Sequence, residues 1–138
     1  MRQGSDVVSV GTRRGLTEIT PAVRAAVRAS GVREGLCTVF IRHTSASLVI
    51  QENADPSVRR DLEAFLSRLV PDGDRLFTHV DEGDDDMPAH AKAALLKTSE
   101  QIPVTGGELA LGTWQGLYVW EHRGGSHRRQ IAVHVLGE

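Results

Sequence analysis

Three histidines stand beside hydroxyl or acidic residues, at points where the sequence passes from one expected element to the next. His43 is followed by two hydroxyl residues, His79 precedes an acidic run, and His90 lies two residues after a proline. Three histidines that leave one coordination position open are a common ligand set of catalytic zinc. The chain has no His-Glu-x-x-His motif and no pair of cysteines, so the site could form only in the folded chain. We therefore expect His43, His79 and His90 to converge on a divalent metal ion, zinc or magnesium; the alternative is three ordinary hydrogen-bonded histidines.

Glu52 is the most unusual acidic residue, because it ends an otherwise apolar face of an expected strand. A carboxylate in that position could act as a general base or could orient a histidine. If strands 36–43 and 47–52 form a hairpin, His43 and Glu52 lie roughly 15 Å apart at about 3.3 Å per residue. They could then share a site only through a loose connection or with a neighbouring subunit. We take His43, Glu52 and His90 as the catalytic candidates.

The other reactive residues have simpler explanations. The run Asp84–Asp86 is either a solvated loop or a source of magnesium ligands or of a general base. His122 and His127 flank a glycine turn and are expected to be solvated, His134 is expected to be structural, and Cys37 is expected to be a buried, inert thiol. The chain lacks the Gly-x-Ser-x-Gly elbow and the Gly-x-x-x-x-Gly-Lys loop, which argues against a serine hydrolase and a nucleoside triphosphatase.

A second set of residues could hold a small ligand. The segment Gly112–Gly116 places two glycines around a tryptophan and a glutamine. It could be a plain tight loop, or it could let the backbone approach a ligand closely while the ring stacks on it. Basic side chains could hold phosphate or could be ordinary surface charge. The ligand-binding candidates are Thr44, Asn53, Lys92, Thr113, Trp114, Gln115 and Arg128.

The elements that must position these residues are mostly strands. Apolar alternation predicts strands at 7–10, 16–19, 36–43, 47–52, 76–79, 102–104, 108–111, 115–122 and 128–136, and the first two are expected to pair through a turn at 13–15. Helices are expected at 20–30, 55–70 and 88–97, with Thr20 and Asp55 as the N-caps of the first two. With no βαβ rhythm and no internal repeat, the sequence predicts one α+β domain over residues 1–138. Its sheets should be mainly antiparallel and sandwich-like, with two or three helices.

Composition narrows the classes of function. The chain has 40% hydrophobic and 25% charged residues, a formal net charge of −2 and one cysteine. The basic residues are not segregated, which argues against nucleic-acid binding. No apolar run approaches the roughly 18 residues of a membrane span, and the first residues lack the apolar region of a signal peptide. One cysteine excludes an intramolecular disulfide framework, and we expect a cytoplasmic protein.

Three runs of residues, in this order, resemble the signature of the YjbQ-type family: His43–Asp61, Glu82–Lys92 and Leu111–Gly116. The resemblance implies a YjbQ-like fold and a homotrimer with clefts at its subunit boundaries. It also implies a thiamine-phosphate synthase activity, secondary to an unknown main role, that joins an aminopyrimidine diphosphate to a thiazole phosphate and releases pyrophosphate. Two alternatives stay open: a metal-dependent hydrolase or lyase acting on another small substrate, and a non-catalytic trimer that binds a small ligand.

Overall fold

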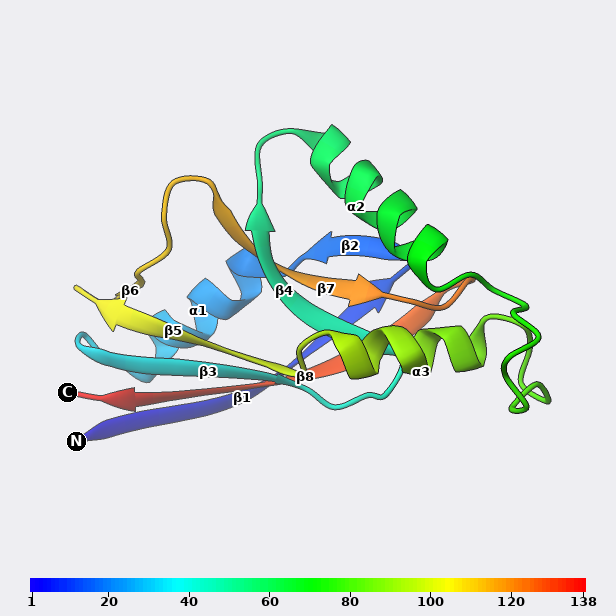
Figure 1. Cartoon of the computed structure of the whole chain (residues 1–138). Coiled ribbons are helices and arrows are strands. Elements are labelled where there is room, and N and C mark those ends of the chain that lie inside the picture. Colours follow the sequence, from blue (N-terminus) through cyan, green and yellow to red (C-terminus); the bar gives the residue numbers. More distant parts are fainter.

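The structure, a computed structural model, describes residues 1–138 as eight strands and three helices. The strands form two antiparallel sheets, ordered β1-β8-β3-β5-β6 and β2-β7-β4 (Figure 1). The larger sheet consists of β1 (Arg2–Thr12), β3 (Gly35–Ile41), β5 (Ser99–Thr105), β6 (Glu108–Leu109) and β8 (His127–Gly137). The smaller sheet consists of β2 (Gly15–Glu18), β4 (Ala46–Glu52) and β7 (Gln115–Glu121). The helices are α1 (Thr20–Ser30), α2 (Pro56–Leu69) and α3 (Asp86–Leu95), and the predicted α+β class is confirmed.

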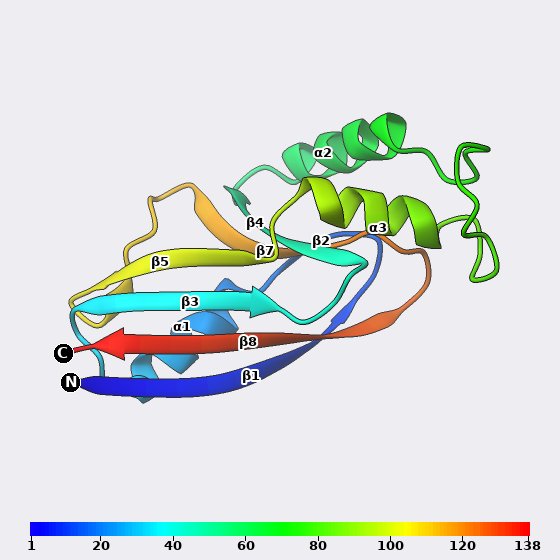
Figure 2. The same cartoon turned by 60° about the horizontal axis from the view of Figure 1, so that its bottom comes forward.

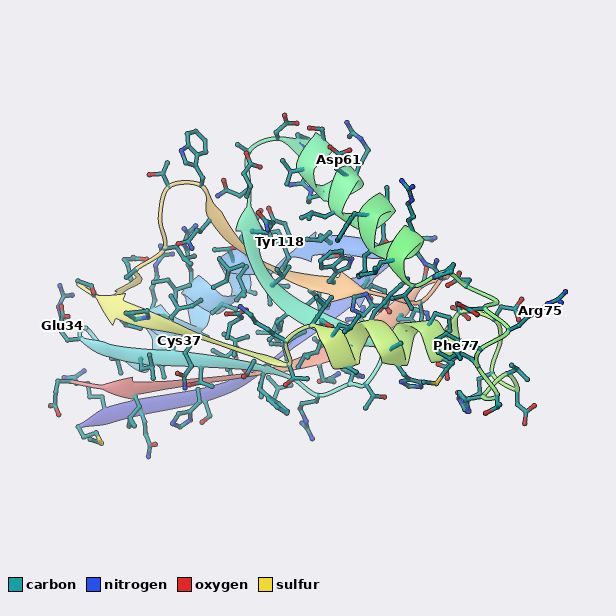
Figure 3. All side chains as sticks on the ribbon, in the orientation of Figure 1. Glu34, Cys37, Asp61, Arg75, Phe77 and Tyr118 are labelled. Carbon is teal, nitrogen blue, oxygen red and sulfur yellow. The ribbon has the colours of Figure 1, made fainter.

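One apolar core joins the two sheets and α1. Both long central strands bury the faces that the alternation predicts, namely Cys37, Val39 and Ile41 on β3 and Ile131, Val133 and Val135 on β8. The same cluster includes Val23 of α1 and Val119 of β7, so the smaller sheet packs on the larger one through this core. Figure 3 shows Cys37 on β3; burial raises the pKa of its thiol to about 11, as expected of an inert thiol.

Strands that are adjacent in the sequence do not pair as hairpins at two places, because the chain passes from one sheet to the other there. The expected pairing of the first two strands is wrong, because β1 pairs with β8 and β2 pairs with β7. β8 has eleven residues that can pair with the backbone of β1, whereas β2 has only four. The turn that ends at Gly15 (φ 114°) directs the chain to the other sheet. β3 and β4 also lie in different sheets, so the connection through His43 passes from one sheet to the other (Figure 2).

The first two helices begin and end near their predicted residues. The Asp55 carboxylate accepts a 2.9 Å hydrogen bond from the Ser57 N–H, which confirms Asp55 as the N-cap of α2. α1 ends at Gly31, which adopts the left-handed conformation. Thr20 does not cap α1 as expected, since its hydroxyl instead accepts a 2.8 Å hydrogen bond from the Leu117 N–H of β7. None of the three helices is long and apolar enough to cross a membrane.

The segment before α3 differs from the prediction. Residues 76–79 form no strand: turns at Gly73 (φ 72°) and Gly83 (φ 104°) enclose the segment, and no strand lies beside it to pair with. α3 begins at Asp86, two residues earlier than predicted. The earlier start places Asp86 and His90 one helical turn apart, on the same face of α3.

Candidate metal centre

His79, Asp86 and His90 form a compact group at the start of α3. The Asp86 Oδ2 atom lies 2.9 Å from His79 Nε2 and 3.0 Å from His90 Nε2. All three potential ligand atoms lie within 4.8 Å of one another. The Asp86 side chain is only 4% exposed, whereas those of His79 and His90 are 44% and 31% exposed. The carboxylate is therefore the buried base of the group, and the two imidazoles form its accessible side.

The main chain near the start of β4 orients His90. The His90 Nδ1 atom lies 2.8 Å from the Thr44 carbonyl oxygen, which can only accept, so Nδ1 carries the hydrogen. Nε2 then faces the Asp86 carboxylate, 3.0 Å away, and it would give up its hydrogen to bind a metal ion. Fixing one ring nitrogen in this way is how proteins prepare the other for a metal ion.

Arg123 provides positive charge behind the carboxylate. Its Nε atom lies 3.5 Å from Asp86 Oδ1 and 3.4 Å from Asp85 Oδ2. Burial alone would raise the pKa of Asp86, but the hydrogen bond from His79 and the charges of His90 and Arg123 outweigh it and hold the pKa below its ordinary value. Asp86 is therefore ionised at neutral pH, as a metal-binding carboxylate must be.

His43 is not part of this group. Its Nε2 atom accepts a 2.7 Å hydrogen bond from the Gln130 N–H, and burial, followed by the charge of Arg129, lowers its pKa. The set that the structure brings together is thus His79, Asp86 and His90, whereas the sequence suggested His43, His79 and His90. Of the predicted ligand-binding residues, Thr44 does meet this group, through its carbonyl oxygen.

Asp86 is the member of the group that sequence reasoning did not select. In the sequence Asp86 is one residue of an acidic run, and the apolar pattern predicts that the helix begins only at Pro88. The usable signal was the spacing of four residues between Asp86 and His90, which places two ligands on one helical face once the helix includes both.

Most of the other candidates gather at the opposite end of β4. The Asn53 side-chain amide donates to the carbonyl oxygens of Thr113 (3.4 Å) and Gln115 (3.3 Å), and its main-chain N–H donates to that of Trp114 (3.1 Å). Trp114 does not pack in the core, and 64% of the residue is exposed. These four residues form one set, and the Trp114 ring is available to a ligand there.

Glu52 closes the turn at this same end of β4. Its carboxylate accepts hydrogen bonds from the N–H groups of Ala54 (3.1 Å) and Asp55 (3.0 Å). Tyr118, whose place under α2 is visible in Figure 3, donates its hydroxyl to the Glu52 carbonyl oxygen at 3.3 Å. The strand from Ala46 to Glu52 separates this turn from the metal centre by roughly 20 Å at about 3.3 Å per residue.

Lys92 and His122 lie in the interior. Lys92 is buried, its Nζ atom has no hydrogen-bond partner, and burial lowers its pKa, so it points away from any ligand at the surface of this chain. His122, expected to be solvated, is fully buried because β7 continues the core up to Glu121. Its Nε2 atom lies 2.9 Å from the Ser47 hydroxyl, and burial lowers its pKa to about 3.

A buried ion pair supports the loop that orients His90. The Arg129 Nε atom donates to Glu121 Oε1 at 2.6 Å, and its Nη2 atom donates to the Ser45 hydroxyl at 2.9 Å. The Thr12 hydroxyl also donates to Glu121 Oε1, at 2.6 Å. Ser45 follows Thr44, so the ion pair fixes the position of the carbonyl that His90 contacts. The remaining candidate, Arg128, is exposed at the start of β8.

Comparisons with known proteins agree on one family. A family model described as "UPF0047 protein YjbQ-like" matches residues 6–138. A UPF0047 protein of Synechocystis sp. is 53% identical over 138 residues, covering 99% of this chain and 94% of that protein. The UPF0047 protein YjbQ of Escherichia coli O157:H7 is 50% identical over 107 residues, covering 78% of this chain and 77% of that protein.

Solved structures share the whole fold. A YbjQ-like protein of unknown function from Sulfolobus solfataricus superposes with a TM-score of 0.84 at 27% identity, covering 99% of each chain. An uncharacterised conserved protein of the yjbq/upf0047 family from Clostridium acetobutylicum gives a TM-score of 0.82 at 37% identity, covering 94% of this chain and 99% of that one.

Proposed function

Because this chain belongs to the YjbQ-like UPF0047 family, whose structures include one described as of unknown function, we propose a function from the geometry of the site itself. We propose that His79, Asp86 and His90 bind a divalent metal ion, and that the protein is a metal-dependent hydrolase or lyase for a small substrate. The observation that carries the proposal is the contact of both Nε2 atoms with one buried carboxylate oxygen, Asp86 Oδ2.

The spacing of the three atoms suits zinc. Ligand bonds of about 2.0–2.1 Å in a tetrahedral site place neighbouring ligand atoms roughly 3.3 Å apart. The two nitrogen–oxygen distances, 2.9 and 3.0 Å, need to widen by only a few tenths of an ångström, whereas the two Nε2 atoms, which lie within 4.8 Å of each other, must move closer together. Two imidazoles and one carboxylate leave a coordination position open, which is the property that separates catalytic zinc sites from structural ones.

The surrounding residues define what such a site could do. A bound zinc ion would supply Lewis acidity toward a carbonyl or phosphoryl oxygen. Asp86 would hold the ion from the buried side, Thr44 would keep the His90 ring in place, and Arg123 would keep Asp86 ionised. The exposed imidazole side leaves room for a small substrate to approach.

Metal analysis tests the proposal directly. Protein loaded with zinc and passed through a desalting column should retain one zinc per chain, measured by plasma mass spectrometry, whereas His79→Ala and His90→Ala should each retain less than a tenth as much. His134→Ala is the matched control, because His134 is an exposed histidine whose ring forms a hydrogen bond only with the Ser5 hydroxyl. Equal zinc retention in all four proteins would refute the metal centre. If the centre is confirmed, hydrolysis and elimination assays on small phosphorylated and carbonyl compounds follow with the loaded protein.

Thiamine-phosphate synthesis is a second candidate reaction. It is favoured by the exposed Trp114 ring, which could stack on an aminopyrimidine, and by the Asp86 carboxylate, which could help to hold magnesium on a diphosphate. Product formation from the two precursors should then require both sets of residues. Loss of the reaction in His90→Ala but full retention in Trp114→Ala would argue against stacking.

We further propose that the assembly is a homotrimer in which the two ends of β4 from different subunits meet. Within one chain they lie too far apart for a small ligand, so a shared site needs a second copy. Large apolar side chains are exposed on the helices, at Phe65 and Leu69 on α2 and at Leu95 on α3, as expected of a surface that another copy covers. Sedimentation equilibrium should give three times the chain mass, and Phe65→Glu with Leu69→Glu should shift it to that of the monomer.

A further inference from the structure

A depression of about 660 Å³ lies where β1, β2 and β8 come together, and no residue of the metal centre lines it. The paired ends of β1 and β8, at Gly11 and Arg128, form one wall, and Thr17 of β2 faces it. None of the seven lining residues is acidic or hydrophobic. The depression is therefore lined by groups that mostly donate hydrogen bonds.

Two pairs of adjacent arginines reach this region, and one member of each pair is already neutralised. Arg14 lies with its Nη1 atom 2.9 Å from Asp72 Oδ2. Arg129 is held by Glu121 in the buried ion pair described above. Arg14 and Arg129 are thus each neutralised by a carboxylate of the chain itself.

The outward members, Arg13 and Arg128, line the depression without a carboxylate partner. The Arg13 side chain makes no ion pair and no hydrogen bond within the chain. Arg128 donates from Nη1 to the Ser9 hydroxyl at 3.2 Å, which orients its guanidinium but does not neutralise it. The hydroxyls of Thr17 and Ser126 also have no partner within the chain. Two uncompensated positive charges and two free hydroxyls thus share one concave surface.

We infer that this depression binds the phosphate group of a small molecule. The guanidinium groups of Arg13, in the turn between β1 and β2, and of Arg128, on β8, can each donate two parallel hydrogen bonds to an anion. Such charge-assisted hydrogen bonds are about twice as strong as neutral ones. A tetrahedral phosphate has enough oxygens to accept from both arginines and from a hydroxyl at once, whereas a carboxylate has only two. The site uses no residue of the metal centre and is independent of the proposed function.

Inorganic phosphate is the probe that tests the site. Amide resonances of the full chain should shift saturably in two segments, 11–17 and 126–128, during titration at constant ionic strength and pH 7.5. Arg13→Gln and Arg128→Gln should each weaken the binding at least tenfold. Arg24→Gln is the matched control, because Arg24 is an exposed arginine of α1 that also lacks a partner and lies outside the depression. Acetate at the same concentration should shift the same amides at least tenfold less.

The outcomes separate the possibilities clearly. Equal weakening in Arg24→Gln, or shifts that never saturate, would show only general attraction of anions and would overturn the inference. Equal binding of acetate would overturn the phosphate assignment. Repeating the titration in His90→Ala removes any contribution from a metal ion: retained binding supports the site, whereas loss would assign the phosphate to the metal centre and refute the inference.

Discussion

The Nδ1 hydrogen of His90 points at the carbonyl oxygen of Thr44, 2.8 Å away, so a main-chain atom sets which nitrogen of His90 faces Asp86. Thr44→Ala keeps this carbonyl and should leave the zinc dissociation constant within about twofold of the parent value. His90→Gln removes the ligand and should weaken zinc binding by more than a hundredfold. Competition with a chelating dye measures both. A large loss in Thr44→Ala would instead assign a role to the threonine hydroxyl.

Glu52 should prove to be a turn residue and not a catalytic one in the isolated chain. Its carboxylate accepts from two main-chain N–H groups, and glutamine keeps an oxygen that can still accept. Glu52→Gln should therefore lower the free energy of unfolding by less than about 1 kcal/mol, and Glu52→Ala by about 1 kcal/mol. Zinc binding should be unchanged in both. If Glu52→Gln keeps its stability and assembly but loses turnover, the general-base role is restored.

The buried pair of Glu121 and Arg129 should be costly to break from one side. Either Glu121→Gln or Arg129→Met leaves one charge buried without its partner, which costs about 3–5 kcal/mol in similar cases. The double variant removes both charges and should be more stable than either single variant. Urea denaturation measures all three. A double variant no more stable than the worse single one would show that the pair does not act as a unit.

His122 should make stability depend on pH. Its pKa is about 3 in the folded chain against an ordinary 6.5, so the unfolded chain binds the extra proton between those values. Stability is therefore fully present above pH 6.5 and is lost as pH falls, by about 2 kcal/mol between pH 7 and pH 5. The lowered pKa of His43 acts in the same direction, so the comparison with His122→Gln isolates one residue. Urea titrations with a chelator present should show a flatter profile in the variant.

The sequence predicts which faces of the strands are buried, because alternation along β3 and β8 is a local property that any partner strand must respect. It does not predict the partners. β1 and β2 are adjacent in sequence with a turn between them, and only the length of β8 shows why β1 pairs elsewhere.

The sequence predicts only part of the metal centre, because its assembly also depends on structure beyond the local pattern. The positions of His79 and His90 at the ends of expected elements indicate a site, but the third member depends on where α3 begins. A start two residues earlier turned Asp86 from a loop acid into a helical neighbour of His90. His122 was missed because its glycine-rich surroundings suggest a turn, and its burial is imposed by the elements packed around it.

β8 lies between β1 and β3 in the larger sheet, although it follows all the other strands in the sequence. Until β8 is in place, β1 has no neighbour in its own sheet and β3 lacks one of its two. The larger sheet therefore closes only when β8 inserts between two strands that lie far from it in the sequence. Folding should accordingly be slow, as it is for topologies dominated by distant pairings.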